Sequence, residues 1–157
     1  MIRFPRSIAR APIVLYRMGL GGLLGRRFVL LEHRGRHSGL IRQVVLETLS
    51  IAPDMIHVVS GYGWSAQWLR NVRADPRVRV TCGSARPRGA RALILQPDEA
   101  VTVLEDYRRR HPLAARVLGP ALGLPRLAAD DPLPKEIGER LPVVRVTGHY
   151  RAARTDC

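Results

Sequence analysis

The connections between apolar segments in the first third of this 157-residue chain are too short to join parallel strands. Apolar runs typical of β-strands occupy residues 27–33, 41–49 and 55–60. A crossover between parallel strands needs about a dozen or more residues, and neither connection here is that long. We therefore expect these three strands to form an antiparallel meander rather than βαβ units.

The rest of the sequence predicts three more strands and several helices. Trp64, Trp68 and Val72 follow a four-residue spacing, which indicates a short helix at 64–74. The remaining expected elements are strands at 77–83, 89–95 and 141–146, a helix from 96 to about 110, and a lid of loop and helix at 112–127. Six antiparallel strands with interposed helices are typical of an α+β protein built on a small closed or nearly closed barrel.

Three aromatic residues near that short helix have different interpretations. Trp64 and Trp68 are core residues by default, because tryptophan is largely buried in most proteins. The functional alternative for Trp68 is that its indole walls a planar ring. Tyr62 lies between Gly61 and Gly63 in a turn, where no core requires an aromatic side chain.

The charge of the chain is strongly and unevenly positive. Lysine and arginine number 26 against 13 acids, a net charge of +13. Residues 1–46 hold nine arginines and one acid, and residues 70–91 hold seven arginines and one acid. Such a surface favours an anionic partner: a nucleic acid, an anionic lipid or a polyanionic small molecule. Nucleic acid is the least favoured, because only 5% of the residues are aromatic, which leaves little stacking surface.

Residues 1–24 are expected to form an amphipathic N-terminal helix or arm, followed by a single domain at 25–157. Four arginines alternate with apolar residues in this segment, and the Gly19–Gly22 run ends the helix. The segment is too short and too charged to span a bilayer, and no small-residue cleavage site follows it. We therefore expect a cytoplasmic protein whose first segment either contacts the anionic inner face of the cell membrane peripherally or packs on the barrel.

Two glycine turns carry the pattern most relevant to function. The first is Gly35-Arg36-His37-Ser38-Gly39 with Arg42 beyond it, and the second is Ser60-Gly61-Tyr62-Gly63. Each turn precedes regular structure and places backbone N–H groups near guanidinium groups. That combination suits an anionic, phosphate-bearing ligand.

No self-contained catalytic or metal site is visible. The chain has no phosphate-binding loop ending in Gly-Lys-Ser/Thr and no strand-linked GxGxxG motif. Its five histidines lack metal-ligand spacing, so we expect no metal. Two cysteines, Cys82 and Cys157, give no disulfide framework, which fits a reducing intracellular setting. If the chain catalyses a reaction, a bound cofactor therefore supplies the chemistry.

Taken together, these motifs resemble those of the deazaflavin-dependent nitroreductase family, split β-barrel oxidoreductases that use coenzyme F420. The resemblance rests on Gly35–Gly39 with Arg42, on Val58–Gly63, on Trp68–Val78 and on Leu141–Val144. It extends from about residue 28 to residue 146 and preserves the order and spacing of the motifs. It implies a single-domain split antiparallel β-barrel of about six strands with flanking helices.

The resemblance also implies roles for individual residues. In the family, the first turn and the arginine after it hold the coenzyme's phosphate and acidic tail, the second turn lies along the deazaflavin ring and its linker, and two helix residues lie beside the cofactor. The matching positions are Arg36, His37, Ser38, Arg42, Ser60, Gly61, Tyr62, Gly63, Trp68 and Asn71. Among them we predict Tyr62 as the candidate catalytic residue, donating a hydrogen bond to the substrate's developing oxyanion.

Two positions depart from the family pattern. Many members carry a lysine directly after the serine of the second turn, where this chain has Gly61. We expect Arg42 or an arginine of residues 70–79 to take that basic role. A tyrosine that faces the substrate in some nitroreductases corresponds to Glu47, and the tyrosines that follow the long helix are absent from 111–127. Reduction of nitroimidazoles is therefore not implied.

The function that we expect is transfer of hydride from reduced deazaflavin to a hydrophobic electrophile such as a quinone or a nitroaromatic. Flavin mononucleotide (FMN) is the alternative cofactor. Two competing hypotheses are a non-catalytic split-barrel carrier of a lipid or fatty acid, and a basic nucleic-acid-binding module. The sequence sets neither the physiological substrate nor the oligomeric state.

Overall fold

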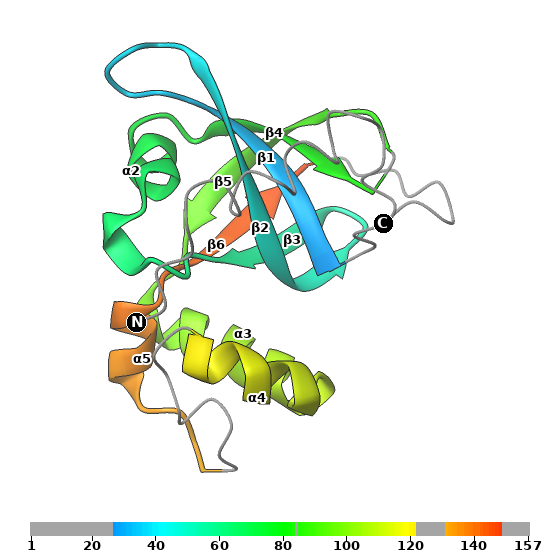
Figure 1. Ribbon diagram of the computed structural model, residues 1–157, viewed down its shortest axis with the longest axis vertical. Coiled ribbons are helices and arrows are strands. Elements are labelled where there is room, and N and C mark those ends of the chain that lie inside the picture. Colours follow the sequence, from blue (N-terminus) through cyan, green and yellow to red (C-terminus); the bar gives the residue numbers. More distant parts are fainter. Residues whose placement is uncertain (1–26, 84, 122–130, 149–157) are drawn as a thin grey trace.

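The computed structural model of the chain describes residues 27–83, 85–121 and 131–148, without the side chains of 117–121. In this part of the chain, six antiparallel strands close into a barrel in the order β1-β2-β3-β6-β5-β4 (Figure 1). The strands are β1 (Phe28–Arg34), β2 (Ile41–Ala52), β3 (Met55–Val59), β4 (Arg77–Cys82), β5 (Arg88–Ile94) and β6 (Val143–Thr147). The predicted meander of the first three strands is confirmed.

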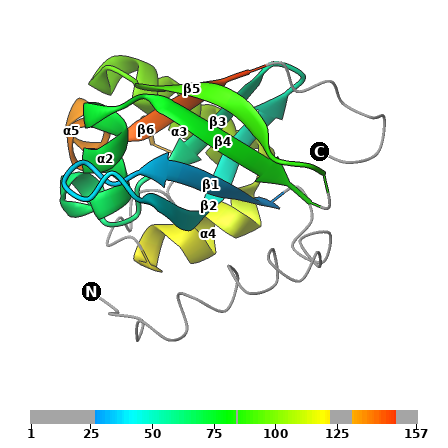
Figure 2. The ribbon, with the colours of Figure 1, turned by 90° about the horizontal axis from the view of Figure 1, so that it is seen from above.

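Helices cover one end and one side of the barrel. They are the 3-10 helix η3 (Gly63–Ser65) and the α-helices α2 (Gln67–Ala74), α3 (Pro97–Arg110), α4 (Pro112–Ala121) and α5 (Lys135–Arg140). Helices α3, α4 and α5 lie together below the barrel in Figure 1, and α2 lies at its side. Figure 2 shows the barrel from above, with α2 beside the connection between β1 and β2. The predicted α+β barrel with flanking helices is therefore confirmed.

Pairing between distant strands closes the barrel. β4 pairs with β1 from His33↔Val78 to Val29↔Cys82, so the strand after α2 returns to the first strand of the meander. β6 pairs with both β3 and β5 and closes the other side. Along β4, Val78 and Val80 are buried while Arg77 and Arg79 are exposed, as the two-residue period of a strand requires. The arginines of this strand therefore lie on the outer surface of the barrel.

Two hydrophobic clusters hold the described structure together. The first fills the barrel and includes Leu31, Val58 and Val144, together with Leu69 and Val72 of α2. The second joins the barrel to the three lower helices through Leu49, Leu104, Tyr107, Ile137 and Val143. Full burial of one such side chain contributes about 1.5–3 kcal/mol. Both α2 and the α3–α5 group are thus fixed to the barrel by apolar burial.

The structure differs from the sequence prediction at two helices. The helix predicted at 64–74 is interrupted at Ala66, whose extended ψ of 126° separates η3 from α2. Trp64 is therefore outside α2 and 46% exposed, so its interpretation as a core residue is wrong, whereas Trp68 is 7% exposed and lies in the core. Helix α5 was missed because it has only six residues, with Gly138 among them, too few for a periodic pattern.

Several other expectations concern residues at the margins of the described structure. Cys82 is buried in β4 and Cys157 lies outside the described residues, so the expectation about disulfides and a reducing setting stays a prediction. The N-terminal helix or arm at 1–24 lies outside the described residues, so its separation from 25–157 stays a prediction. Helix α4 occupies the first part of the lid predicted at 112–127, and residues 122–127 lie outside the described residues.

Leu104 provides a test of the packing between the barrel and the lower helices. Its side chain is fully buried, whereas Leu113 at the start of α4 is 75% exposed. We expect Leu104→Ala to lower the free energy of unfolding by about 2–5 kcal/mol, because it removes buried methyl groups and leaves a cavity. The matched change Leu113→Ala should cost less than about 0.5 kcal/mol. Urea titrations of both variants test this, and similar losses would contradict the packing described.

Candidate functional site

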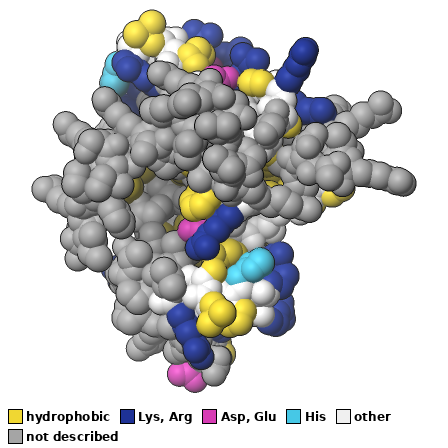
Figure 3. All heavy atoms as spheres, turned by 45° about the vertical axis from the view of Figure 1, so that its right-hand side comes forward, with side chains coloured by type: hydrophobic (Ala, Val, Ile, Leu, Met, Phe, Trp, Pro, Cys, Tyr) yellow, Lys and Arg dark blue, Asp and Glu magenta, His cyan; other side chains and the backbone are white. Residues whose placement is uncertain are grey.

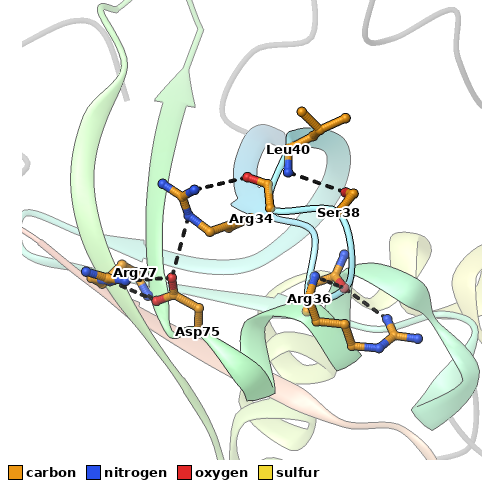
Figure 4. A network of polar contacts seen from close by, with 8 residues as sticks. Arg34, Arg36, Ser38, Leu40, Asp75 and Arg77 are labelled. Carbon is orange, nitrogen blue, oxygen red and sulfur yellow. Dashed lines mark hydrogen bonds and ion pairs between the residues drawn. The ribbon is translucent and has the colours of Figure 1, made fainter.

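The first glycine turn, between β1 and β2, is closed by its own backbone. The Gly35 N–H donates to the Leu40 carbonyl and the Gly39 N–H to the Gly35 carbonyl, each at 2.8 Å. Gly39 has a φ of 67°, a left-handed conformation that favours glycine. The Leu40 N–H donates to Ser38 Oγ at 3.3 Å, and Arg34 Nη1 donates to the Gly39 carbonyl at 3.0 Å (Figure 4). The sequence of the turn thus fixes its shape locally.

Arg36 joins this turn to α2. Its backbone N–H and its Nη1 both donate to Asn71 Oδ1, at 3.2 and 2.9 Å, and its two terminal nitrogens donate to Gln67 Oε1 at 3.1 Å. Gln67 and Asn71 are four residues apart and therefore lie on one face of the helix. Arg36 thus lies along α2, whereas the neighbouring Arg34 turns toward Asp75 (Figure 4).

Asn71 also reaches a buried histidine of the barrel. Because its Oδ1 accepts two hydrogen bonds from Arg36, its Nδ2 is the donor toward His33 Nδ1, at 3.2 Å. Nδ1 must then accept, so His33 is neutral and carries its proton on Nε2. Burial lowers the pKa of His33, and the positive charge of Arg42 lowers it further, against the effect of a backbone hydrogen bond at Arg34.

Some hydrogen-bond donors of the first turn have no partner among the described residues. The backbone N–H groups of His37 and Ser38 donate to no atom in the described part of the chain. Arg42 pairs with His33 across β1 and β2 and is exposed, and its guanidinium makes no ion pair or hydrogen bond with a described residue. Free backbone N–H groups and unpaired guanidinium groups bind phosphate and carboxylate oxygens.

The second glycine turn connects β3 to η3 and α2. Ser60 is fully buried, its Oγ donates to the Gly63 carbonyl at 2.8 Å, and its N–H donates to the Pro142 carbonyl at 3.0 Å. Gly63 has a φ of 57°, and a Cβ there would lie 2.9 Å from the Arg140 carbonyl oxygen, which explains the glycine. Tyr62 is 54% exposed, and no described group bonds its hydroxyl. The turn therefore exposes the phenol of Tyr62 to solvent, on a backbone that these hydrogen bonds hold in place.

The predicted site residues are thus distributed around one helix. The structure brings Arg36 and Asn71 into contact, and it places the second turn directly before η3 and α2. Trp68 lies on α2 but faces the barrel core, among the buried residues. His37, Ser38 and Arg42 lie at the tip and far side of the first turn, exposed to solvent.

Sequence reasoning missed Gln67 and His33 as part of this arrangement. Gln67 was detectable, because it precedes Asn71 by four residues on a predicted helix. His33 was not, because nothing in the sequence pairs a strand histidine with a helix asparagine 38 residues later.

Glu47 stands where the resemblance implies a tyrosine. It belongs to a second cluster of hydrogen-bonded side chains, with Tyr107 and Arg27. Its Oε1 accepts hydrogen bonds from Tyr107 Oη at 3.0 Å and from Arg27 Nε at 3.2 Å. Burial raises the pKa of Tyr107, and the Glu47 carboxylate raises it further, so the phenol stays protonated. This group borders a cavity of about 400 Å³ between β2 and the α3–α4 pair. Glu47 thus fixes the side chains of Tyr107 and Arg27, which line this cavity.

The electrostatic character of the described surface is cationic. Arginine and lysine side chains outnumber acidic ones on the face shown in Figure 3, in line with the net charge of +13. Within the described residues no group of three or more histidine, cysteine, aspartate or glutamate side chains is arranged to hold a metal ion. The ligand that this surface favours is therefore an anion.

Comparison with known families identifies one match. Residues 14–114, more than half of the chain, match the model of a family described as F420H(2)-dependent quinone reductase. A search of curated proteins found no match.

Several solved structures are similar to this chain. An F420-H2 dependent reductase (FDR-A) is 26% identical, with 77% of this chain and 94% of that chain covered and a TM-score of 0.48. Atu2129 from Agrobacterium tumefaciens, of unknown function, is 19% identical, with coverages of 99% and 64% and a TM-score of 0.52. HutZ, the heme storage protein of Vibrio cholerae, is 12% identical, with coverages of 94% and 91% and a TM-score of 0.54. The last two, with TM-scores above 0.5, show a similarity of fold alone.

The neutral state of His33 gives a pH dependence with a defined sign. Burial lowers the pKa of His33 and of His57 below the ordinary value of about 6.5, so the unfolded chain takes up protons first as the pH falls. Their stabilising contribution is fully present above pH ~6.5 and decreases as the pH drops from there toward the lowered values. We expect urea titration to give a lower free energy of unfolding at pH 5 than at pH 8.

Single substitutions identify the histidine responsible. His33→Gln should decrease the difference between pH 8 and pH 5, whereas His37→Gln, which changes an exposed residue of the same turn, should leave it unchanged. A pH dependence in His33→Gln equal to that of the wild type would show that His33 is not held neutral.

Proposed function

Because the chain belongs to the F420H(2)-dependent quinone reductase family, we propose that its two glycine turns, Arg42 and α2 form the binding site for the deazaflavin coenzyme. As a member of that family, the protein is a split-barrel oxidoreductase that depends on coenzyme F420. The observation that carries the assignment of the site is the set of uncommitted donors at the first turn. They are the backbone N–H groups of His37 and Ser38 and the guanidinium of Arg42.

We assign the first turn to the anionic part of the coenzyme. Arg42 contributes a charged contact, and the N–H groups of His37 and Ser38 contribute two backbone donors. A charge-assisted contact typically adds about 1.5–3 kcal/mol to binding. Arg36 donates to Gln67 and Asn71, so its role is to hold the turn on α2.

The second turn is assigned to the deazaflavin ring and its linker. Ser60 uses its hydroxyl to fix the turn, which leaves the backbone at Gly61 and Gly63 as the surface along which the ring lies. Tyr62 extends from this surface with a hydroxyl that no described residue bonds. Trp68 supports the turn from within the core, and its predicted contact with the ring stays a prediction.

When bound, the coenzyme supplies a hydride for reduction of a hydrophobic electrophile, a quinone in this family. The chain's residues orient the two reactants and exclude water, which converts a bimolecular step into one between fixed groups. Tyr62 donates a hydrogen bond from Oη to the substrate oxygen on which negative charge develops.

Arg42 provides the most direct test of the anion site. We expect Arg42→Ala to raise the dissociation constant of coenzyme F420 at least tenfold, the effect of losing a contact of about 1.5 kcal/mol. The control Arg109→Ala removes an exposed arginine from α3 and should leave the constant unchanged. Unchanged binding in a folded Arg42→Ala variant would mean that Arg42 is only a solvent-exposed residue at the start of β2 and does not contact the coenzyme.

Tyr62→Phe separates hydrogen-bond donation from ring packing. Loss of the hydroxyl should decrease kcat with a quinone about tenfold, equivalent to about 1.4 kcal/mol of transition-state stabilisation, with the coenzyme dissociation constant unchanged. Tyr62→Leu should weaken coenzyme binding as well, because it also removes the ring. If Tyr62→Phe retains full turnover of every accepted substrate, Tyr62 is only a surface for the ring.

No helix in the described part of the chain is long and apolar enough to cross a membrane. We propose that residues 1–24, which lie outside that part, adsorb to anionic membranes and bring the protein to a lipid-soluble quinone. Each arginine near an anionic leaflet contributes about 1 kcal/mol, so adsorption should weaken at high salt. Co-sedimentation with anionic and neutral vesicles tests this. Equal sedimentation of the full chain and of a chain beginning at Gly25 would refute it.

A further inference from the structure

A groove of about 770 Å³ lies on the outer side of the barrel, between η3 and α2 on one wall and β5 with the start of α3 on the other. We propose that this groove binds a single-chain anionic amphiphile, such as a medium-chain carboxylate, at a site separate from the coenzyme site. Its head would lie at Arg73 and Arg91, and its chain would extend toward Leu93 and Trp64.

The groove and the coenzyme site use different faces of α2. Gln67 and Asn71 face the first glycine turn, whereas Val72 and Arg73 line the groove. At 100° per residue, Arg73 lies about 200° around the helix from Asn71. The two ligands would therefore contact different faces of α2, although Gly63 of the second turn and Trp64 of the groove both belong to η3.

One end of the groove is cationic and lacks a counter-charge. Arg91 lies directly opposite Arg77 across β4 and β5, and a hydrogen bond of 2.9 Å from the Ala92 N–H to the Pro76 carbonyl holds this end beside the end of α2. Like charges in directly opposite positions are destabilising. Asp75 binds Arg77 through both carboxylate oxygens, but Arg73 and Arg91 make no ion pair with a described residue. Among the described residues, no aspartate or glutamate lines the groove. An anion at this end would therefore pair with Arg73 and Arg91, which have no counter-charge among the described residues.

The other end is apolar. Leu93 is 56% exposed and Trp64 is 46% exposed, and both line the groove together with Ile94 and Pro97. The Trp64 Nε1–H donates to the Glu139 carbonyl at 2.6 Å, which satisfies the only polar atom of the indole and fixes the ring. An apolar ligand segment on this surface would gain from burial without leaving a polar atom unpaired.

The groove is less well suited to other kinds of ligand, because each would use only one of its two ends. An inorganic anion would use only the arginine end, and a neutral lipid only the apolar end. Helix α2, with eight residues, is about 12 Å long, so the groove along it suits one extended chain. A second copy of this chain would bring its own arginines, and the net charge of +13 opposes that association.

Fluorescence titration with decanoate below its micellar concentration tests the proposal. The protein has two tryptophans, and Trp68 is buried in the core, so Trp64 is the reporter of the groove. We expect a saturable change in emission, at least tenfold weaker apparent binding of decanol, and a dissociation constant for decanoate at least fivefold higher in Arg91→Gln. Leu93→Asp should abolish binding. The control Arg79→Gln, which removes an exposed arginine from the neighbouring strand outside the groove, should bind as the wild type does.

Three results would overturn the proposal. The first is equal binding of decanol and decanoate, or no effect of Arg91→Gln. The second is that the protein binds phosphatidylglycerol vesicles but not monomeric decanoate, and that Leu93→Asp weakens the vesicle binding. The surface would then be a membrane-binding surface. The third is a wild-type dimer that Leu93→Asp dissociates, without decanoate binding, which would assign it to a second copy. Coenzyme binding should be the same in Arg91→Gln as in the wild type, so the outcome is independent of the proposed coenzyme site.

Discussion

The side-chain amide of Asn71 connects the barrel, α2 and the first glycine turn. Its oxygen accepts two hydrogen bonds from Arg36, and its nitrogen donates to the buried ring of His33. A side chain without both a donor and an acceptor cannot satisfy these partners, and an unsatisfied buried polar group costs about 1–3 kcal/mol. The position of the turn relative to α2, and hence of the donors at its tip, therefore depends on this amide together with that of Gln67.

Helix α2 also relates the two halves of the proposed site to each other. The first turn rests on Gln67 and Asn71, and the second turn leads through η3 into the same helix. Apolar burial of Leu69 and Val72 fixes α2 to the barrel core. An anion-binding turn and a ring-binding turn are thereby held on one rigid element, as binding of a long cofactor in a single orientation requires.

The sequence predicts the barrel well because turn length and residue alternation are local properties. The strands at 27–33, 41–49 and 55–60 were recognisable from apolar runs and short connections, and the structure extends the second of them to Ala52. The break at Ala66, and with it the exposure of Trp64, depends on contacts with α5, a helix too short to predict. The pairing of His33 with Asn71 likewise depends on tertiary contact. The uncommitted donors at the first turn agree with the anionic ligand that the sequence predicts, but the roles of individual residues stay predictions.

The central claim is that the first turn and Arg42 bind the anionic part of the coenzyme. Calorimetric titration of the protein with intact coenzyme F420, and with the deazaflavin ring and its ribityl chain lacking phosphate and tail, tests it most directly. We predict that the intact coenzyme binds at least tenfold more tightly, that the difference decreases with added salt, and that FMN binds more weakly than the intact coenzyme. Equal affinity for the intact coenzyme and the truncated ring would contradict the account.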